Sequence, residues 1–197
     1  MSNLNRFDTA KPAVFLDRDG TLNLEKNYLY RAEDFEFIPG AVEAVSMLNH
    51  AGFLVVVLTN QSGIARGLYS EADLQRLHRH VDTLLAAEGA RVDAWYYCPH
   101  HPEGREPYRQ LCNCRKPLPG MLFQAAAEHG IDLSRSWMVG DKAVDVEAGL
   151  AAGCRPILVR TGYGAQAEQD LPSGIEVCND LLAAVRGITG CQPDGEK

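Results

Sequence analysis

Along most of this 197-residue chain, short apolar runs alternate with segments that have the periodicity of helices, and this alternation limits the possible folds more than any other feature. The apolar runs end at turn or polar residues, as buried strands do, and they cover residues 13–16, 53–58, 92–97, 137–139 and 156–159. Caps and apolar spacing indicate helices near 39–51, 70–89, 119–130 and 142–152. This order predicts an α/β fold, with a doubly wound, mainly parallel sheet and helices on both faces.

The chain is long enough, and at 46% hydrophobic residues apolar enough, to bury one substantial core. We therefore expect a single domain over residues 1–190. A flexible tail is expected at 191–197, because the sequence from about residue 187 onward is polar and lacks periodicity. Only one loop and one helix fit between Thr21 and Thr59, which leaves no room for a separate cap domain. We expect the loop, residues 25–37, to lie over an open pocket.

The charged residues, 19 Lys and Arg against 26 Asp and Glu, give a formal net charge of −7. This charge disfavours nonspecific binding to nucleic acid or to an anionic membrane, and it favours a small-molecule substrate. No apolar stretch has the length of a signal-peptide core or of a membrane span, so the expected location is the cytoplasm. We expect a monomer with neither a nucleic-acid nor a membrane partner.

Two acids, Asp17 and Asp19, follow the first apolar run on a turn that contains Gly20. In an extended segment their side chains lie on one face, where they repel each other unless a cation such as Mg²⁺ lies between them. Thr59 and Asp141 also come directly after apolar runs. Because the carboxyl ends of parallel strands share one edge of the sheet, these polar groups are predicted to converge there.

Acids at a strand end, a further acid, a hydroxyl and a lysine are the groups that phosphoryl transfer through an aspartyl-phosphate needs. A carboxylate attacks phosphorus, a metal offsets the charge, and cations or donors hold the phosphoryl oxygens. Mg²⁺ usually takes one or two carboxylates, which fits Asp17 and Asp141 with the carbonyl of Asp19. Taken singly, each of these residues is equally well a helix cap, a turn former or an ordinary strand-end residue.

A loop over residues 98–114 contains three thiols and an imidazole, which form a complete tetrahedral zinc set with no position left for water: Cys98, His100, Cys112 and Cys114. We interpret this zinc as structural. His101 is an alternative to His100, and unliganded buried cysteines are the alternative to a metal site. The loop lacks the basic helix of a nucleic-acid-binding finger. The other three cysteines are expected to be inert: Cys154, Cys178 and Cys191.

Four motifs, in order and at predicted strand ends, resemble those of the haloacid dehalogenase-like phosphatases: DRDGT at 17–21, LTNQSG at 58–63, CRKP at 114–117 and GDKxxD at 140–145. The resemblance spans nearly the whole chain and implies a Rossmann-like fold, Mg²⁺-dependent phosphatase activity and the same four zinc ligands. It also implies that Asp17 is the nucleophile, and that Asp19 protonates the leaving oxygen and then activates water.

The same resemblance implies that Thr59 and Lys116 bind the transferring phosphoryl group and that Asp141 completes the metal site. We expect Asp145 to orient Lys142 or metal-bound waters, with a solvated helix residue as the alternative. Because Cys114 lies two residues before Lys116, a zinc-anchored loop is predicted to hold that lysine against the phosphate.

Within the family, TNQSGIARG at 59–67, CPHH at 98–101 and CNCRKP at 112–117 resemble a branch that acts on a sugar bisphosphate. A second phosphate explains the additional cationic groups. The resemblance implies that, with Thr59 and Lys116, the substrate is bound by Glu25, Lys26, Asn27, Tyr28, Asn60, Gln61, Ser62, Arg115 and Lys142. A solvated turn is the plainer interpretation of 25–28. We assign no function to the Gly-Tyr-Gly sequence at 162–164.

Two other functions compete with this prediction. A phosphatase of the same branch that acts on histidinol phosphate shares the motifs and the zinc loop, but the GIARG extension after TNQS argues against it. A phospho-accepting receiver domain also combines Asp, Thr and Lys on a parallel sheet. It needs a long-lived phospho-aspartate, whereas an acid beside the nucleophile suits turnover. A zinc-binding interaction module leaves the acids at the strand ends unused.

Overall fold

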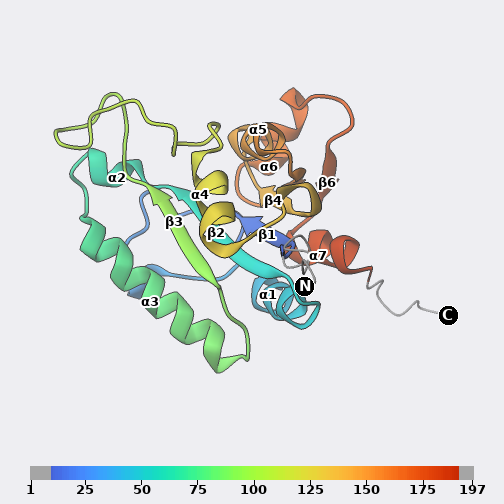
Figure 1. The fold of residues 1–197 in the computed structure, drawn as a ribbon. Coiled ribbons are helices and arrows are strands. Elements are labelled where there is room, and N and C mark those ends of the chain that lie inside the picture. The colour runs from blue at the N-terminus through green and yellow to red at the C-terminus, as the bar shows by residue number, and fades with distance from the viewer. Residues whose placement is uncertain (1–9, 191–197) are drawn as a thin grey trace, which may run out of the picture.

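The centre of the computed structural model, which describes residues 10–190, is a sheet of six parallel strands in the order β3-β2-β1-β4-β5-β6 (Figure 1). The order reverses at β1, which pairs with β2 on one side and β4 on the other. Such a switch point opens a crevice at the carboxyl ends of the strands. The strands are β1 Ala13–Leu16, β2 Leu54–Asn60, β3 Ala94–Cys98, β4 Trp137–Gly140, β5 Arg155–Val159 and β6 Glu176–Cys178.

Helices cover both faces of the sheet, which confirms the predicted doubly wound α/β fold. One face packs against α1, α3 and α7, and the other against α4 and α5. The α-helices are α1 Ala41–His50, α2 Ser62–Ala65, α3 Glu71–Ala87, α4 Gly120–His129, α5 Ala143–Ala152, α6 Gly164–Ala167 and α7 Leu181–Thr189. No helix within residues 10–190 has both the length and the apolar character that crossing a membrane requires.

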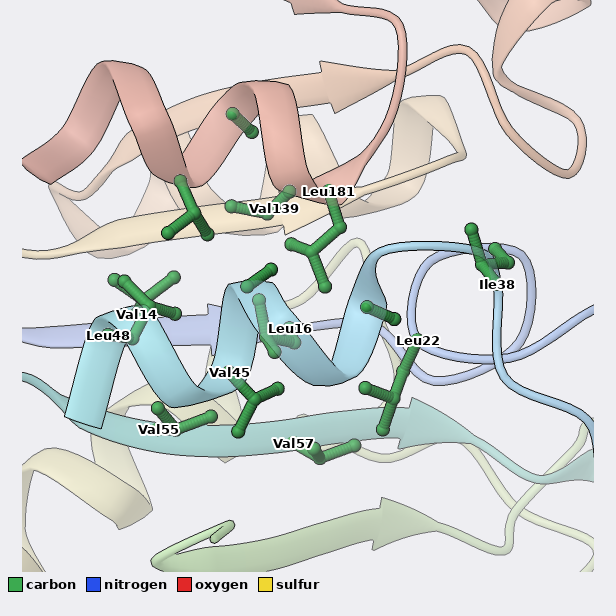
Figure 2. Close-up of a cluster of buried hydrophobic side chains, with 14 of the residues drawn as sticks. Val14, Leu16, Leu22, Ile38, Val45, Leu48, Val55, Val57, Val139 and Leu181 are labelled. Atoms are coloured by element: carbon green, nitrogen blue, oxygen red, sulfur yellow. The ribbon is translucent and has the colours of Figure 1, made fainter. Parts of the chain in front are cut away.

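The central strands have apolar side chains on both faces because each face packs on helices. In β1, Val14 and Leu16 face the cluster under α1, whereas Phe15 faces the cluster under α4 and α5. Figure 2 shows α1 lying over the strands, with its Val45 and Leu48 directed toward them. Full burial of an aliphatic or aromatic side chain contributes about 1.5–3 kcal/mol. The ends of β1 and β2, where the polar motifs begin, are therefore fixed by the core.

The chain between β1 and β2 holds a loop, a short 3-10 helix at Ala32–Asp34 and α1, as expected for a chain without an inserted cap. Two elements near the C-terminus, β6 and α7, were not predicted. The expected tail from about residue 187 is wrong over 187–189, which belong to α7. Asp180 caps this helix by accepting a hydrogen bond from the Ala183 N–H, and Leu181, Ala184 and Val185 are buried. The predicted tail at 191–197, with Cys191, lies outside the described residues.

Candidate active site

The carboxyl ends of β1, β2 and β4 bring three acids and a lysine together. Lys116 is buried, and its Nζ lies 2.7 Å from Asp17 Oδ1 and 2.6 Å from Asp145 Oδ1. It also donates to the Leu58 carbonyl at 2.8 Å. Asp17, Asp141 and Asp145, called the acid cluster below, each place a carboxylate oxygen within 4.8 Å of the others. The side chain of Asp145 is therefore not solvated. It pairs with Lys116 and accepts a hydrogen bond from the Lys142 backbone N–H.

Burial makes it costly for all three acids to be ionised together. Burial, followed by the charge of Asp17, raises the pKa of Asp141 to about 8. Burial also raises the pKa of Asp145 to about 6, against the opposing charge of Lys116. For Lys116, burial favours the neutral amine, but Asp145 and Asp17 outweigh it and raise the lysine pKa. The cluster thus holds more negative charge than one lysine offsets, which favours a bound cation.

The oxygen atoms of Asp141 also fit a hard divalent ion. Its Oδ2 accepts a hydrogen bond from the Tyr163 N–H at 2.8 Å. Its Oδ1 is buried and has no hydrogen-bond partner among residues 10–190. An orphaned buried carboxylate oxygen is costly, and carboxylate oxygens are the ligands that Mg²⁺ prefers. The acid cluster could therefore hold such an ion between Asp17 and Asp141.

A segment after β5, residues 161–163, orients Asp141, although the sequence analysis gave it no role. The Thr161 hydroxyl donates to the Gly20 carbonyl at 2.6 Å, which ties this segment to the first motif. Gly162 has φ +56°, and a Cβ there would lie 2.2 Å from Asp141 Oδ2. The Lys142 ammonium lies 4.9 Å from the ring centroid of Tyr163. The only feature of the local sequence that could have indicated this role is Gly162, which lies between Thr161 and Tyr163.

Asp19 is held by donors from three directions. Arg18, fully buried, donates from Nη2 to Asp19 Oδ2 at 2.8 Å and from Nε to Oδ1 at 3.1 Å. Asn23 and Gln61 donate to the same carboxylate at 3.0 and 3.1 Å. Burial pushes the pKa of Asp19 upward, but Arg18 and the hydrogen bonds outweigh burial and lower it. Arg18 and Asn23 were not singled out from the sequence, where an arginine between two acids resembles an ordinary surface residue.

A cavity of about 410 Å³ opens beside the acid cluster. Its walls include ten of the eleven residues predicted to bind substrate: Glu25, Asn27, Tyr28, Thr59, Asn60, Gln61, Ser62, Arg115, Lys116 and Lys142. Tyr69, Val144 and Tyr163 line it as well. The cavity is thus bounded by the loop over the rim, by the end of β2 and by the segment after the cysteine loop.

Lys26 is not among the residues that line the cavity. Its ammonium donates to the Asp34 carbonyl at 2.8 Å and lies 3.2 Å from Glu36 Oε2. Both partners of Lys26 lie within the same loop. Its ammonium, which the sequence suggested as a substrate ligand, pairs here with the Glu36 carboxylate. Lys142 instead reaches across to the loop, with its Nζ 3.2 Å from Glu25 Oε2.

Three thiols and an imidazole meet where the long loop after β3 begins and ends, and we call this set the Cys/His cluster: Cys98, His100, Cys112 and Cys114. The three sulfur atoms lie 3.2–3.4 Å apart, too far for a disulfide bond. His100 Nδ1 lies 3.4 Å from Cys114 Sγ. His101 instead contacts Arg66 and the Glu103 N–H, so geometry favours His100 as the fourth ligand. The cluster could hold a tetrahedral metal ion.

The loop that carries the Cys/His cluster runs over α2 and the start of α3 (Figure 1). The Arg105 N–H donates to the Ala65 carbonyl at 2.7 Å. Glu71, in the first turn of α3, accepts hydrogen bonds from the hydroxyls of Tyr97 and Tyr108. Two residues after Cys114, the Lys116 backbone exchanges two hydrogen bonds with the side chain of Asn60, at 3.0 and 3.1 Å. The loop therefore connects the Cys/His cluster to the lysine of the acid cluster.

Comparison with known proteins places this geometry in a family. A family model described as "HAD-hyrolase-like" matches residues 113–184. The chain is 46% identical over 181 residues to D-glycero-beta-D-manno-heptose-1,7-bisphosphate 7-phosphatase of Photorhabdus laumondii, covering 90% of this chain and 96% of the relative. It is 50% identical over 153 residues to the enzyme of that name from Escherichia coli K12, covering 77% and 80%. The chain belongs to the haloacid dehalogenase-like phosphatases.

A solved structure supports the same membership. D,D-heptose 1.7-bisphosphate phosphatase from B. bronchiseptica, complexed with magnesium and phosphate, superposes with a TM-score of 0.82 at 38% identity. The match covers 91% of this chain and 98% of that one. The phosphatase is therefore a phosphoric monoester hydrolase, and the resemblance carried by the four motifs is confirmed. Phosphatases of this family use Mg²⁺, in keeping with the donor set of the acid cluster.

Proposed function

We propose that this phosphatase removes the 7-phosphate of D-glycero-D-manno-heptose 1,7-bisphosphate. The observation that carries the proposal is the 46–50% identity, over more than three quarters of the chain, to enzymes named for that reaction. The cavity agrees with a bisphosphate, since Arg115 and Lys142 line it in addition to Lys116. One phosphate at the acid cluster leaves these two cations for the far phosphate.

The product of this reaction is a heptose 1-phosphate. We propose that it supplies the ADP-heptose used to build the lipopolysaccharide core. The charge and composition of the chain support an enzyme that works as a cytoplasmic monomer, without nucleic-acid or membrane partners. The role in lipopolysaccharide synthesis follows from the substrate and fails with it.

The two candidate metal sites receive different roles in this proposal. Asp17, Asp141 and the carbonyl of Asp19 would hold Mg²⁺, which when bound offsets the repulsion between a carboxylate and the phosphate dianion. Asp145 neutralises Lys116 rather than binding the metal, since both of its oxygens are engaged: Oδ1 lies 2.6 Å from Lys116 Nζ, and Oδ2 accepts from the Lys142 backbone N–H. The Cys/His cluster would hold a structural zinc ion, because its four protein ligands fill a tetrahedral shell.

In the first half of the reaction, a carboxylate oxygen of Asp17 attacks phosphorus and the bond to the sugar oxygen breaks. Asp19 gives its proton to that leaving oxygen. The Thr59 hydroxyl and the Lys116 ammonium hold phosphoryl oxygens, since both residues line the same cavity as Asp17. The lowered pKa of Asp19 means that its carboxylate is ionised in the free enzyme. Asp19 must therefore gain a proton when the substrate binds, because the negative charge of the phosphate raises the pKa of a nearby carboxylate.

In the second half, the ionised Asp19 removes a proton from water, and the resulting hydroxide attacks phosphorus of the Asp17 phosphoester. The bond to Asp17 breaks, inorganic phosphate leaves and the nucleophile is restored. The donors from Arg18, Asn23 and Gln61 favour the ionised form of Asp19 that this step requires. The free enzyme therefore has Asp19 in the state of the second half-reaction.

A direct comparison of substrates tests the proposal. We expect phosphate release from the heptose 1,7-bisphosphate to exceed that from histidinol phosphate by at least about a hundredfold in kcat/KM, equivalent to about 2.7 kcal/mol. Phosphorus NMR of the product should retain the signal of the anomeric phosphate and lose that of the 7-phosphate. Assays of the α and β anomers separate the two possible preferences. A preference for histidinol phosphate, or loss of the anomeric phosphate, contradicts the proposal.

A further inference from the structure

A buried row of hydrogen bonds leads from Tyr69, near the start of α3, to the catalytic groups. We propose that Tyr69 is a positioning residue that holds the side-chain amide of Gln61 in the orientation set by the Asp19 carboxylate, and thereby directs the Thr59 hydroxyl toward the substrate phosphate. The inference rests on the proposed roles of Asp19 and Thr59 and deepens them. Tyr69 reaches these groups through Gln61.

The row has three members besides Asp19, and all are buried. Tyr69 is 7% exposed, Gln61 is 2% exposed and Thr59 is 1% exposed. The Tyr69 hydroxyl donates to Gln61 Oε1. Gln61 Nε2 donates to Thr59 Oγ1 at 2.7 Å and to Asp19 Oδ2 at 3.1 Å. Every polar atom of the Gln61 amide therefore has an assigned partner.

The direction of the row follows from what each group can donate. Both oxygens of the Asp19 side chain accept hydrogen bonds from Arg18, so the NH₂ of Gln61 faces Asp19 Oδ2 as a further donor and the Gln61 carbonyl faces Tyr69. Tyr69 must then be the donor, and burial, the main influence on its pKa, raises that pKa and keeps the phenol protonated. Thr59 Oγ1 already accepts from Gln61. Its own proton is thus left to point into the cavity, where a phosphoryl oxygen would bind.

The reversed amide has no equivalent arrangement. Turning Gln61 over places its carbonyl oxygen against the Asp19 carboxylate, where two acceptors repel. The same reversal makes the Thr59 hydroxyl donate to Gln61, which removes its proton from the cavity. The Asp19 carboxylate discriminates between the two orientations, and the Tyr69 hydroxyl stabilises the observed one by donating to the Gln61 carbonyl from the far side of the amide. Without that hydroxyl, the carbonyl of Gln61 is left buried without a donor.

The ring of Tyr69 is positioned independently of its hydroxyl. It stacks on Tyr30 with ring centroids 5.1 Å apart and an angle of 13° between the planes. It also occupies the space beside Gly63, where a Cβ would lie 2.2 Å from the ring. The glycine of the TNQSG motif is thereby explained, because any side chain there would displace Tyr69. Removing the hydroxyl alone should therefore leave the packing intact.

The test compares Tyr69→Phe, Gln61→Met and the double variant in steady-state assays with saturating Mg²⁺. We expect Tyr69→Phe to lower kcat about tenfold and to change KM less than about threefold, because the lost contact acts on groups that serve the transition state. Methionine nearly matches the length of glutamine without its polar atoms. In the Gln61→Met background, Tyr69→Phe should change kcat less than twofold, because the coupling between the two residues is gone.

Tyr30→Phe is the matched control, since the Tyr30 hydroxyl contacts only the exposed Arg31 side chain among the described residues. It should keep the wild-type kcat. Multiplicative effects of the two variants, or an unchanged kcat in a folded Tyr69→Phe protein, overturn the inference. If the wild type does not hydrolyse the heptose bisphosphate, the same ratios are measured with p-nitrophenyl phosphate. The result then bears on Tyr69 separately from the substrate assignment.

Discussion

Only Arg115 separates Cys114 of the Cys/His cluster from Lys116, which pairs with the acid cluster, but the chain assembles the two clusters differently. The acid cluster takes side chains from positions 17, 141 and 145, which meet because core packing aligns β1 with β4. The Cys/His cluster takes all four side chains from residues 98–114, and three of them are only partly buried. Packing of the sheet holds the acid cluster in place, whereas the Cys/His cluster depends on metal binding by its four side chains and on a few loop contacts.

Lys116 is where the two modes of assembly meet. Its side chain pairs with Asp17 and Asp145 of the acid cluster. Its backbone lies two residues after Cys114 and is hydrogen-bonded to the Asn60 side chain. A sheet edge can position carboxylates that come from strand ends. It cannot position a lysine that lies on a loop, so the segment that carries the Cys/His cluster must position Lys116. The two clusters should therefore fail differently when they are perturbed.

The largest effect is expected where the core supplies the reacting atom. Asp17→Asn removes the nucleophile, so kcat should fall by at least about a thousandfold. The fold should survive, because the change removes one charge from a group of three buried acids. Phosphate release and thermal unfolding measure the two properties. Asp170→Asn, at an exposed position, is the matched control and should keep full activity. Turnover of Asp17→Asn close to the wild-type rate rules out the nucleophile.

Removing the metal from the Cys/His cluster should have the next largest effect. We expect kcat in saturating Mg²⁺ to fall about tenfold to a hundredfold, because loosening Cys114 shifts Lys116, and displacement of about an ångström costs roughly that much. Metal content by mass spectrometry and kcat are measured on the same chelated sample, before and after zinc is restored. Cys112→Ser should behave like the chelated protein. An unchanged kcat in a folded, zinc-free sample separates the two clusters completely.

Gly162→Ala tests whether crowding at Asp141 disturbs the acid cluster without touching the loop. A Cβ at Gly162 would lie 2.2 Å from Asp141 Oδ2, and the residue has φ +56°. We expect the Mg²⁺ concentration for half-maximal activity to rise about tenfold or more. Gly130→Ala is the control, because it has a similar φ of +63° but nothing within 4 Å of the added Cβ. If Gly162→Ala keeps the Mg²⁺ dependence of the wild type and of Gly130→Ala, crowding at Gly162 does not disturb Asp141.

The sequence predicted the cluster whose members end strands and the cluster whose members are close along the chain. The ends of apolar runs located Asp17, Thr59 and Asp141, and Ser70 with Asp73 located the start of α3. Local patterns carry that information. They also carried the spacing of the four cysteine and histidine ligands.

The sequence could not predict contacts between distant segments. Gln61 meets Asp19, and Thr161 meets Gly20, only because the fold brings their segments together. For Lys26, substrate binding stays a prediction. Its position near the expected phosphate site suggested a ligand, and in the structure it pairs with Glu36 of the same loop. The residue type alone does not tell whether a lysine pairs with a nearby carboxylate or with a phosphate, because the distances in the folded structure decide which partner it contacts.

The smallest expected effect concerns the core beneath both clusters. His78 of α3 is 5% exposed and stacks on Trp95, with ring centroids 4.2 Å apart. Burial, and next the charge of Arg18, lowers the pKa of His78 to about 3. The unfolded chain binds a proton below its ordinary pKa of about 6.5, whereas the folded chain does not until about pH 3. Unfolding therefore becomes easier as pH falls through this window.

Between pH 7 and pH 5, this histidine alone should lower the free energy of unfolding by about 2 kcal/mol, since each pH unit below 6.5 contributes about 1.4 kcal/mol. Urea unfolding at the two pH values measures the loss. His78→Phe should reduce the pH dependence by that amount, whereas His80→Gln, a less buried position on the same helix, should not. If His78→Phe leaves the pH dependence unchanged, His78 is protonated in the folded core. That result would contradict the expectation, drawn from its burial and from the charge of Arg18, that His78 is neutral in the folded protein.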